Sequence, residues 1–410
     1  MNERWGSMGE TLSLPMFPLF YCGWMNMFSC EVPNYKDISG CAIVGIMSEN
    51  GNCFHGGQII EAIANMHDRS NGLGGGFAAY GIYPEFKDYY ALHIMFEDEL
   101  SARETEEFLQ RTFIIYHKEV IPHRHDTSIQ KHPLLRRYFV IPIPIKEDTP
   151  DVVFEHLSDD DIVFRSVMEI NTGVRGAFVF SSGKNMGIFK GVGYPEDIGE
   201  FYQLERYKGY IWVAHGRFPT NTTGWWGGAH PFGLLNWAVV HNGEISSYGI
   251  NRRYLANFGY HCALQTDTEV IVYLFDLLFR KHEMPLEAVC IALAPPFWAE
   301  FEQMSEENQK LALYIRMVYG GALLNGPFSI IVSNSDIMMG LNDRIKLRPM
   351  VAACKNDHLY IASEEAAIRT VCPSPDVIWH ADGGVPIIGR LKTAPPLPLS
   401  TFYNGRRVTI

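Results

Sequence analysis

The sequence predicts a layered α+β protein. Short runs of apolar and β-branched residues, typical of buried strands, gather toward both ends of the chain, and the clearest helical patterns lie between them. This grouping differs from the regular strand–helix alternation of a parallel α/β sheet. The composition is that of a folded globular chain, because 47% of the 410 residues are hydrophobic and 20% are charged.

The elements follow in order along the chain. An apolar, β-branched run over 41–47 ends at the turn signal Ser48-Glu49-Asn50-Gly51 and predicts the first strand. Apolar spacing predicts helices over 61–67, 101–118 and 267–282. Further strands are expected at 78–83, 174–181, 185–190, 211–214, 237–240, 328–332, 336–340, 350–353 and 358–362. The segments 174–181 and 185–190 are expected to pair with each other across a tight turn.

Charge and cysteine content exclude several classes of protein. Lys and Arg number 34 against 46 Asp and Glu, which gives a net charge of −12. Such a balance argues against binding to nucleic acid or to an anionic membrane through bulk charge. Eight cysteines are too few for a disulfide scaffold, and no C-x-x-C pair indicates a zinc ribbon. We therefore expect a cytoplasmic protein without a metal site; His123 and His125 are too isolated to argue for one.

The first forty residues differ from the rest. Residues 11–30 are apolar and aromatic, so a signal peptide or a membrane anchor has to be considered. Pro15 and Pro18 would break a spanning helix, and no A-x-A cleavage site follows. We interpret residues 1–40 as a leader or propeptide, with a misassigned start codon as the alternative, and place the start of the folded domain at Cys41.

Cys41 opens the first predicted strand and has two interpretations. A small thiol at the start of a strand is usually a core residue. If the chain is cut between Gly40 and Cys41, however, the thiol and a free α-amine belong to the same residue. An α-amine has a pKa near 8, close to the value of about 8.5 for a thiol, so it can take the thiol proton at neutral pH. Cys41 would then be a nucleophile that needs no separate histidine base.

Two further motifs follow predicted strands. Arg217 comes just past the strand at 211–214, and its planar guanidinium suits a carboxylate, although a surface ion pair is the simpler interpretation. Asn242-Gly243 comes just past the strand at 237–240 and has the sequence of a hairpin turn. The same dipeptide can direct the Asn amide and the Gly N–H at one oxyanion.

The segment Thr266-Asp267-Thr268-Glu269 begins the predicted helix at 267–282. Thr266 and Glu269 have the spacing of a capping box, which explains the motif without a ligand. Asp267 stands outside that cap, and its carboxylate can bind an ammonium group. Together the four motifs supply a nucleophile, an anion clamp, an oxyanion hole and an ammonium clamp. A free amino acid with a reactive side-chain carbonyl needs this combination.

These motifs, in this order, resemble those of the class II glutamine amidotransferases, which are N-terminal-nucleophile hydrolases. The resemblance rests on Cys41 with Gly45-Ile46, HGRFPTN at 215–221, HNGEI at 241–245 and TDTEV at 266–270. The amidotransferase part of glutamate synthase is the most similar member, because later blocks also match: Gly326-Pro327-Phe328-Ser329, Leu341-Asn342-Asp343-Arg344, Leu347-Arg348-Pro349 and Ala362-Ser363-Glu364-Glu365. The resemblance runs from residue 41 to about residue 370 and is weakest over 100–170.

The resemblance implies a four-layer αββα sandwich over residues 41–410, with residues 100–170 as a family-specific insertion. It makes Cys41 the nucleophile and its α-amine the base. Arg217 would bind the α-carboxylate of glutamine and Thr220 would line the same pocket. Asn242 and Gly243 would form the oxyanion hole, and Asp267 would bind the α-ammonium group.

The implied function is the hydrolysis of L-glutamine through a γ-glutamyl thioester, with ammonia passed to a synthase site. Nothing in this chain resembles a flavin-binding barrel or an iron–sulfur motif, so we expect no cofactor here and a separate, flavin-dependent synthase subunit of the glutamate synthase type. The alternatives are a non-catalytic glutamine sensor on the same fold and another amidase with an N-terminal cysteine. Trp225-Trp226 is either part of a lid over bound glutamine or a packed pair.

Overall fold

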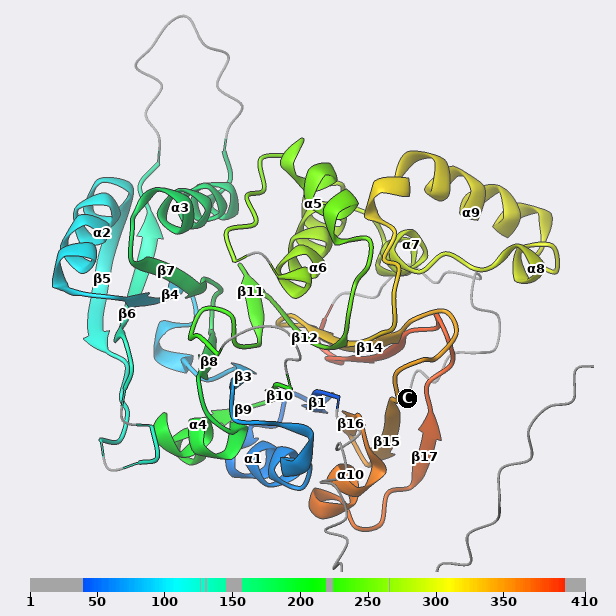
Figure 1. Cartoon of the computed structure of the whole chain (residues 1–410), viewed down its shortest axis with the longest axis horizontal. Coiled ribbons are helices and arrows are strands. Elements are labelled where there is room, and N and C mark those ends of the chain that lie inside the picture. Colours follow the sequence, from blue (N-terminus) through cyan, green and yellow to red (C-terminus); the bar gives the residue numbers. More distant parts are fainter. Residues whose placement is uncertain are drawn as a thin grey trace, which may run out of the picture. The chain divides into compact units, whose positions relative to one another are not determined.

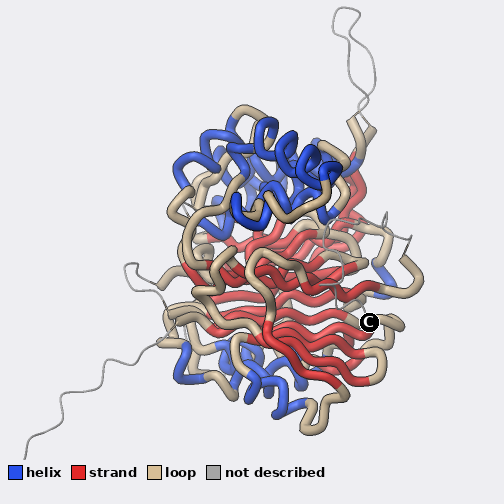
Figure 2. Tube along the Cα trace, turned by 90° about the vertical axis from the view of Figure 1, so that its right-hand side faces the viewer, coloured by secondary structure: helices blue, strands red, loops and turns tan. Residues whose placement is uncertain are grey.

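The computed structural model describes residues 40–125, 127–129, 131–144, 157–218, 224–264 and 266–394. These residues belong to one compact unit. Two antiparallel sheets lie face to face, and helices cover the outer face of each, so that the order of layers is helices, sheet, sheet, helices (Figure 2). This arrangement confirms the predicted α+β class and agrees with the four-layer sandwich. The predicted leader, apart from Gly40, lies outside the described residues, as do residues 395–410.

The larger sheet has seven strands in the order β17-β15-β16-β1-β10-β3-β8. Its strands are β1 (Ala42–Ser48), β3 (Gly75–Tyr80), β8 (Met186–Gly191), β10 (Ile211–Gly216), β15 (Val351–Lys355), β16 (His358–Ala362) and β17 (Val377–His380). Strand β1 lies between β10 and β16 and is buried along its whole length. A near-continuous apolar sequence suits a strand that is covered on both faces.

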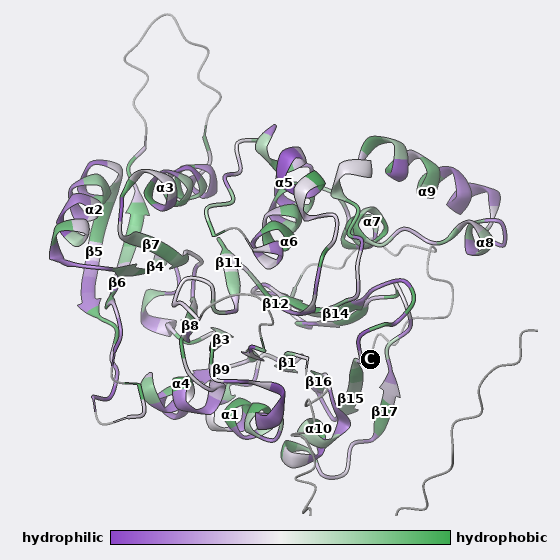
Figure 3. Cartoon of the chain, viewed as in Figure 1, coloured by the Kyte–Doolittle hydropathy of each residue, from purple (hydrophilic) through white to green (hydrophobic). Residues whose placement is uncertain are grey.

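The second sheet has five strands in the order β11-β12-β13-β14-β18. They are β11 (Phe232–Leu234), β12 (Trp237–Gly243), β13 (Phe328–Ser333), β14 (Ile337–Asn342) and β18 (Ile387–Arg390). The two sheets approach closely where Gly45 of β1 faces β14, because a β-carbon on Gly45 would lie 2.7 Å from the sulfur of Met338. Apolar strands such as β14 are green in Figure 3. The core between the sheets is therefore tightly packed.

Helices form the two outer layers (Figure 1). Helices α1 (Gly57–Ala64), α4 (Pro195–Phe201) and α10 (Glu365–Val371) pack on the larger sheet. Helix α6 (Asp267–Phe275) packs on β11 and β12, with α5 (Tyr248–Ala256) and α7 (Leu286–Leu293) in the same layer. Beyond them lie α8 (Trp298–Phe301) and α9 (Glu306–Val318). None of the helices in the described ranges is long and apolar enough to cross a membrane.

A third sheet adds to one side of this arrangement, in the order β5-β6-β4-β7. It consists of β4 (Tyr90–Phe96), β5 (Phe113–Val120), β6 (Leu134–Pro142) and β7 (Ala177–Ser181), with α2 (Glu99–Thr112) and α3 (Asp159–Gly173) packed against it. Most of the predicted insertion at 100–170 thus builds α2, β5, β6 and part of α3. The remaining short elements are β2 (Phe54–His55), β9 (Lys208–Gly209), 3₁₀ turns at His67–Arg69, Pro84–Phe86, Leu204–Arg206 and Gly320–Ala322, and a π-helical turn at Asp276–Lys281.

Most predicted elements are confirmed, and two predictions were wrong. The helix expected over 101–118 ends at Thr112, and the chain continues as β5, because the run Phe113-Ile114-Ile115 favours a strand. The segments around 174–181 and 185–190 do not pair: β7 joins β4, and β8 joins β3. Their connection is bound elsewhere, since Leu235 N–H donates to Ser182 Oγ at 2.9 Å.

Candidate functional site

Cys41 lies directly before β1, at the end of the larger sheet where β10 also ends. The pair Ala42 and Gly216 begins the register between β1 and β10, so the residue after β10 is brought to Cys41. The backbone N–H of Phe218 donates to Cys41 Sγ at 3.4 Å. Burial raises the pKa of the Cys41 thiol, while the Phe218 N–H and the charges of Arg217 and Arg348 oppose that rise. The thiol is therefore a partly buried group in a cationic setting.

Arg217 is held in place through its own backbone. Its N–H donates to Gly74 O at 2.8 Å, and its carbonyl accepts from the Asn71 N–H and from Ser70 Oγ, both at 3.2 Å. A β-carbon on Gly74 would lie 3.1 Å from Arg217 Cδ, so this glycine leaves room for the arginine stem. Burial lowers the pKa of Arg217, and the opposite charges of Cys41 and Asp267 counteract this effect. Arg217 is thus in electrostatic contact with both predicted site residues.

Asn242 is fully buried in β12, and its side chain lies beside Gly40, the residue before Cys41. The strand continues through Asn242 and Gly243, which pair with Ser329 and Phe328 of β13, so the dipeptide does not form a hairpin turn. Neither Nδ2 nor Oδ1 of Asn242 has a hydrogen-bond partner among the described residues. An unpaired buried amide costs about 1–3 kcal/mol, so such groups are retained where they have a use.

Gly243 can only be glycine in this conformation. Its φ is +150°, and a β-carbon would lie 2.0 Å from Pro327 O. The neighbouring Glu244 N–H donates to the same carbonyl at 2.9 Å, which fixes the turn away from β12. The close approach of two backbone segments explains the glycine and sets the direction in which the chain leaves Asn242.

Asp267 is the first residue of α6 and lies between two anchoring groups. Its Oδ2 accepts the Ile245 N–H at 2.9 Å, and its Oδ1 lies 3.6 Å from His241 Nδ1. Burial alone would raise the pKa of Asp267, but the His241 ring and the hydrogen bonds to the carboxylate hold that pKa below its usual value. Asp267 is therefore a fixed anion at neutral pH.

One of the two hydrogen bonds of the predicted capping box is present. Thr266 Oγ1 accepts the Glu269 N–H at 3.2 Å, as expected of an N-cap. The Glu269 side chain does not return to Thr266; instead its carboxylate accepts the N–H groups of Ala263 and Leu264, both at 3.0 Å. Glu269 ties the loop before α6 to the helix, and Asp267 remains outside the cap.

Three features around these residues were not predicted: the side chains of Arg348 and Arg69, and a stacked pair of histidine rings. A β-carbon on Gly40 would lie 3.2 Å from Arg348 Nη1 and 3.4 Å from Arg69 Nη2, so two further cations lie beside the residue that precedes Cys41. Behind it the rings of His215 and His230 stack with centroids 4.0 Å apart. The signals were present, because Arg348 and His215 lie inside motifs that had been recognised, but no role had been given to them.

His215 is held as a neutral ring. Its Nε2 lies 3.1 Å from the carbonyl of His241, which can only accept, so this nitrogen carries the proton. Burial and the nearby charge of Arg217 lower the pKa of His215 to about 3. The ring therefore supports β12 beside Asn242 and adds no charge to the site.

The structure brings Cys41, Arg217, Asn242, Gly243 and Asp267 to one end of the two facing sheets. Thr220 lies outside the described residues, together with the rest of 219–223. Trp225 and Trp226 follow this gap: Trp225 is 45% exposed, whereas Trp226 packs against Phe201 of α4 with ring centroids 5.9 Å apart. The lid and packed-pair interpretations of the two tryptophans both stay open.

Comparisons with known proteins identify the family. The sequence model described as glutamine amidotransferases class-II matches residues 125–263. A protein of Archaeoglobus fulgidus is 52% identical over 361 residues, which are 87% of this chain and 94% of its own length. A protein of Methanothermobacter thermautotrophicus, named "Putative glutamine amidotransferase", is 24% identical over 84% of this chain and 98% of its own length.

Two further matches cover only part of the other protein. The glutamate synthase [NADPH] large chain of Bacillus subtilis is 28% identical over 44% of this chain and 13% of its own length. The solved glutamine phosphoribosylpyrophosphate amidotransferase of B. subtilis matches with a TM-score of 0.44 and 14% identity, over 85% of this chain and 47% of that one. The family match includes Arg217 and Asn242-Gly243, and over residues 125–263 the chain has the sequence of a class II glutamine amidotransferase.

Proposed function

We propose that this chain hydrolyses L-glutamine at Cys41, once residues 1–40 have been removed, and delivers the ammonia to a synthase on another polypeptide. One observation carries the proposal: the Cys41 thiol lies within electrostatic reach of a cation, Arg217, and an anion, Asp267. A neutral acyl amide has no use for two clamps of opposite charge. A free α-amino acid with a side-chain amide uses both.

The catalytic steps follow from the groups around Cys41. The free α-amine takes the thiol proton, and the thiolate attacks the side-chain carbonyl carbon of glutamine. The Asn242 amide and the Gly243 N–H stabilise the oxyanion. The protonated α-amine then gives its proton to the departing nitrogen, which leaves as ammonia. Water, deprotonated by the same amine, releases glutamate from the thioester and restores the thiol.

Two charged side chains select the substrate. Arg217 binds the α-carboxylate, because a guanidinium forks onto a carboxylate with two hydrogen bonds. Asp267 binds the α-ammonium group, and Thr220 adds to the carboxylate side of the pocket. Each clamp is fixed by backbone hydrogen bonds, so the pocket is organised before glutamine binds.

The ammonia acceptor is proposed to be a flavin-dependent synthase subunit of the glutamate synthase type. Support comes from the partial match to a glutamate synthase large chain, which covers 44% of this chain. In this proposal the flavin and the iron–sulfur cluster belong to the partner. Ammonia made at Cys41 would be used there, which gives a separate hydrolase chain its purpose.

The decisive experiment compares glutamate release by the mature protein and by Cys41→Ala. We expect a loss of at least a thousandfold with an unchanged circular dichroism spectrum, while Cys53→Ala, at an exposed cysteine, keeps full activity. Undiminished activity of Cys41→Ala would overturn the proposal. A glutamine sensor would bind glutamine without releasing glutamate, and an acyl amidase would turn over simple amides as fast as glutamine.

A further inference from the structure

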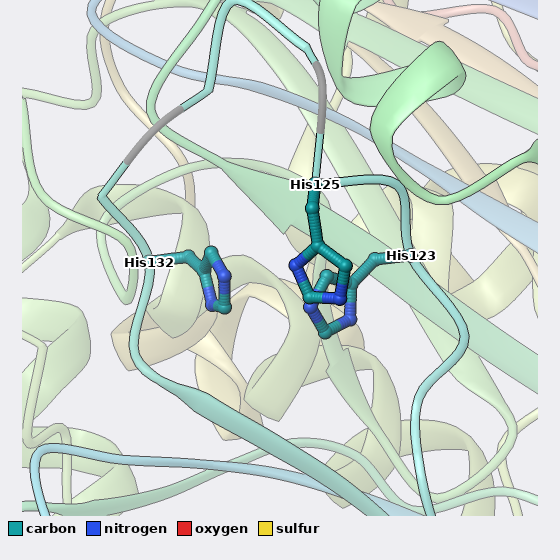
Figure 4. Close-up of side chains that lie close together, drawn as sticks. All are labelled: His123, His125 and His132. Atoms are coloured by element: carbon teal, nitrogen blue, oxygen red, sulfur yellow. The ribbon is translucent and has the colours of Figure 1, made fainter.

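Three histidines converge beside the third sheet, away from Cys41. His123 and His125 follow β5, and His132 precedes β6 (Figure 4). One ring nitrogen from each histidine lies within 4.8 Å of the corresponding nitrogens of the other two. His123 and His132 are partly buried, and His125 is exposed. The sequence spacing hid this group, because His132 is brought back to the pair only by the fold of the loop.

Two of the three rings are oriented like metal ligands. His123 Nδ1 lies 2.8 Å from the carbonyl of Ile121, and His132 Nδ1 lies 2.9 Å from the carbonyl of Pro133. A carbonyl only accepts, so each Nδ1 carries the proton and each Nε2 presents a lone pair. Histidines that bind metals characteristically donate their other ring N–H to a carbonyl or carboxylate in this way.

The Nε2 atom of His123, which carries the lone pair in this tautomer, has no hydrogen-bond partner among the described residues. This atom is buried. A buried acceptor of this kind is costly unless it binds a proton donor or a metal. The unpaired lone pair, the fixed tautomer and the two neighbouring imidazoles are all features of a metal-binding site.

We propose that His123, His125 and His132 bind one first-row transition-metal ion, with zinc as the natural candidate. Imidazole nitrogens suit zinc, copper, nickel and iron, whereas magnesium and calcium require oxygen ligands. Nitrogens that share one tetrahedral zinc at about 2.1 Å lie roughly 3.4 Å apart. The three nitrogens, which lie within 4.8 Å of one another, would have to draw closer by up to about 1.4 Å to share one ion. Three protein ligands leave a fourth position for water.

The charge of Arg124 does not oppose a cation. Arg124 stands between two of the ligands in sequence, but its guanidinium is turned to Glu200 and Glu205, at 3.1 and 2.6 Å. The Arg124 N–H donates to Phe201 O at 2.8 Å and fastens the loop to α4. The positive charge closest in sequence is thus neutralised by its own carboxylate partners.

Two of the proposed ligands also make aromatic contacts with other parts of the chain. Phe201 of α4 stacks on His123 with centroids 4.9 Å apart, and Trp226 faces His132 at 6.4 Å. Trp226 lies in the segment between Arg217 and His230. A metal held by the three histidines would fix the rings of His123 and His132 against Phe201 and Trp226.

The test measures metal content and metal binding of the purified full chain. After removal of metal with a chelator, we expect titration with zinc to give one equivalent bound, and cobalt to give visible absorption bands typical of a four-coordinate site. His125→Ala is the first variant, because its ring is exposed and the fold does not depend on it. It should weaken zinc binding at least tenfold, as should His132→Ala.

Controls separate this site from adventitious binding. His380→Ala, at another exposed histidine, should leave the stoichiometry and the affinity unchanged. Zinc should also raise the melting temperature of the unaltered protein and of His380→Ala, but not that of His125→Ala. Zinc stoichiometry and affinity that are equal in His125→Ala, His132→Ala and the unaltered protein would overturn the proposal, as would the absence of binding. Neither result depends on glutamine hydrolysis.

Discussion

Gly40 and Asn242 are neighbours: Oδ1 of Asn242 lies 3.2 Å from the position that a β-carbon on Gly40 would take. Gly40 therefore lies beside the buried amide that the proposed mechanism needs for the oxyanion. With residue 40 attached, the nitrogen of Cys41 is also part of a peptide bond and cannot accept a proton. Under the proposed mechanism, a chain that keeps residue 40 would lack the base and would have residue 40 beside the amide of Asn242.

The first prediction concerns the start of the active protein. We expect intact-mass analysis of active protein to give Cys41 as the first residue. A gene that begins at Met-Cys41 should give full glutaminase activity after the initiator methionine is removed, because no leader then remains. A protein that is active while residue 40 is still attached would contradict this prediction.

The second prediction tests the amide of Asn242. Asn242→Ala should lower kcat by about 10²–10³, the usual loss for one oxyanion donor, and change KM little. The amide has no hydrogen-bond partner among the described residues, so its removal breaks no hydrogen bond; relief of the unpaired amide should offset the cavity left by alanine, with little net change in melting temperature. Asn257→Ala, at an exposed position after α5, is the matched control and should keep normal kinetics. A variant with unchanged kcat would remove Asn242 from the mechanism.

How far sequence alone leads can be judged from particular segments. The strands at 211–214 and 237–240 were predictable because each is a short, continuous apolar run, the pattern expected of a strand that is covered on both faces. The strand at 113–120 was not predicted, since its charged and apolar residues continue the helical spacing of α2; the run Phe113-Ile114-Ile115 favours a strand, and pairing with β6 stabilises it. The partner of β7 could not be predicted either, because register with β4 is decided by contacts between distant segments.

The candidate site also contains residues whose positions the sequence predicts and residues whose positions it does not predict. Cys41, Arg217, Asn242 and Asp267 each begin or follow a recognisable element, so their positions could be predicted and the structure brings them together. Arg69 and Arg348 approach Gly40 through connections between elements, which carry no periodic signal. His132 joins His123 for the same reason. Sequence patterns locate residues on elements, whereas the contacts between loops depend on the whole fold.

The third prediction concerns recognition of the α-ammonium group. Asp267→Asn keeps an acceptor for the Ile245 N–H but removes the negative charge, so the fold should persist while glutamine binds more weakly. A hydrogen bond to a charged group contributes about 1.5–3 kcal/mol, which corresponds to a rise in KM of roughly 10–150-fold. Asp88→Asn, at an exposed carboxylate, should have no effect. An unchanged KM would show that Asp267 does not contact the substrate.

The fourth prediction compares two glycines with positive φ. A β-carbon on Gly243 would lie 2.0 Å from Pro327 O, whereas one on Gly259 would meet nothing within 4 Å, at φ +82°. Gly259→Ala should therefore lower the free energy of unfolding by only about 1–2 kcal/mol, the usual cost of a left-handed conformation. Gly243→Ala should cost several kcal/mol more, because two backbone segments must separate. Equal losses in chemical denaturation would contradict this explanation.

The buried pair Lys190 and Glu269 makes the stability of the protein depend on pH. Burial lowers the pKa of Lys190 to about 7, and burial raises the pKa of Glu269 to about 7, with each charge partly offsetting the effect on the other. Both side chains line one small internal cavity beneath β11. A carboxyl whose pKa is raised by folding binds more protons in the folded state, so its contribution to stability falls as the pH rises from about 4.5 to 7.

The fifth prediction isolates that contribution with Glu269→Gln. The variant cannot titrate, so its free energy of unfolding relative to the unaltered protein should rise between pH 4.5 and 7, by about 3 kcal/mol at 1.4 kcal/mol per pKa unit. Urea denaturation at several pH values measures this difference, and Glu61→Gln, at an exposed position, should show no such trend. A constant difference across the range would mean that the pKa of Glu269 is not raised by folding. Because only the change with pH is compared, the loss of the Ala263 and Leu264 hydrogen bonds does not affect the result.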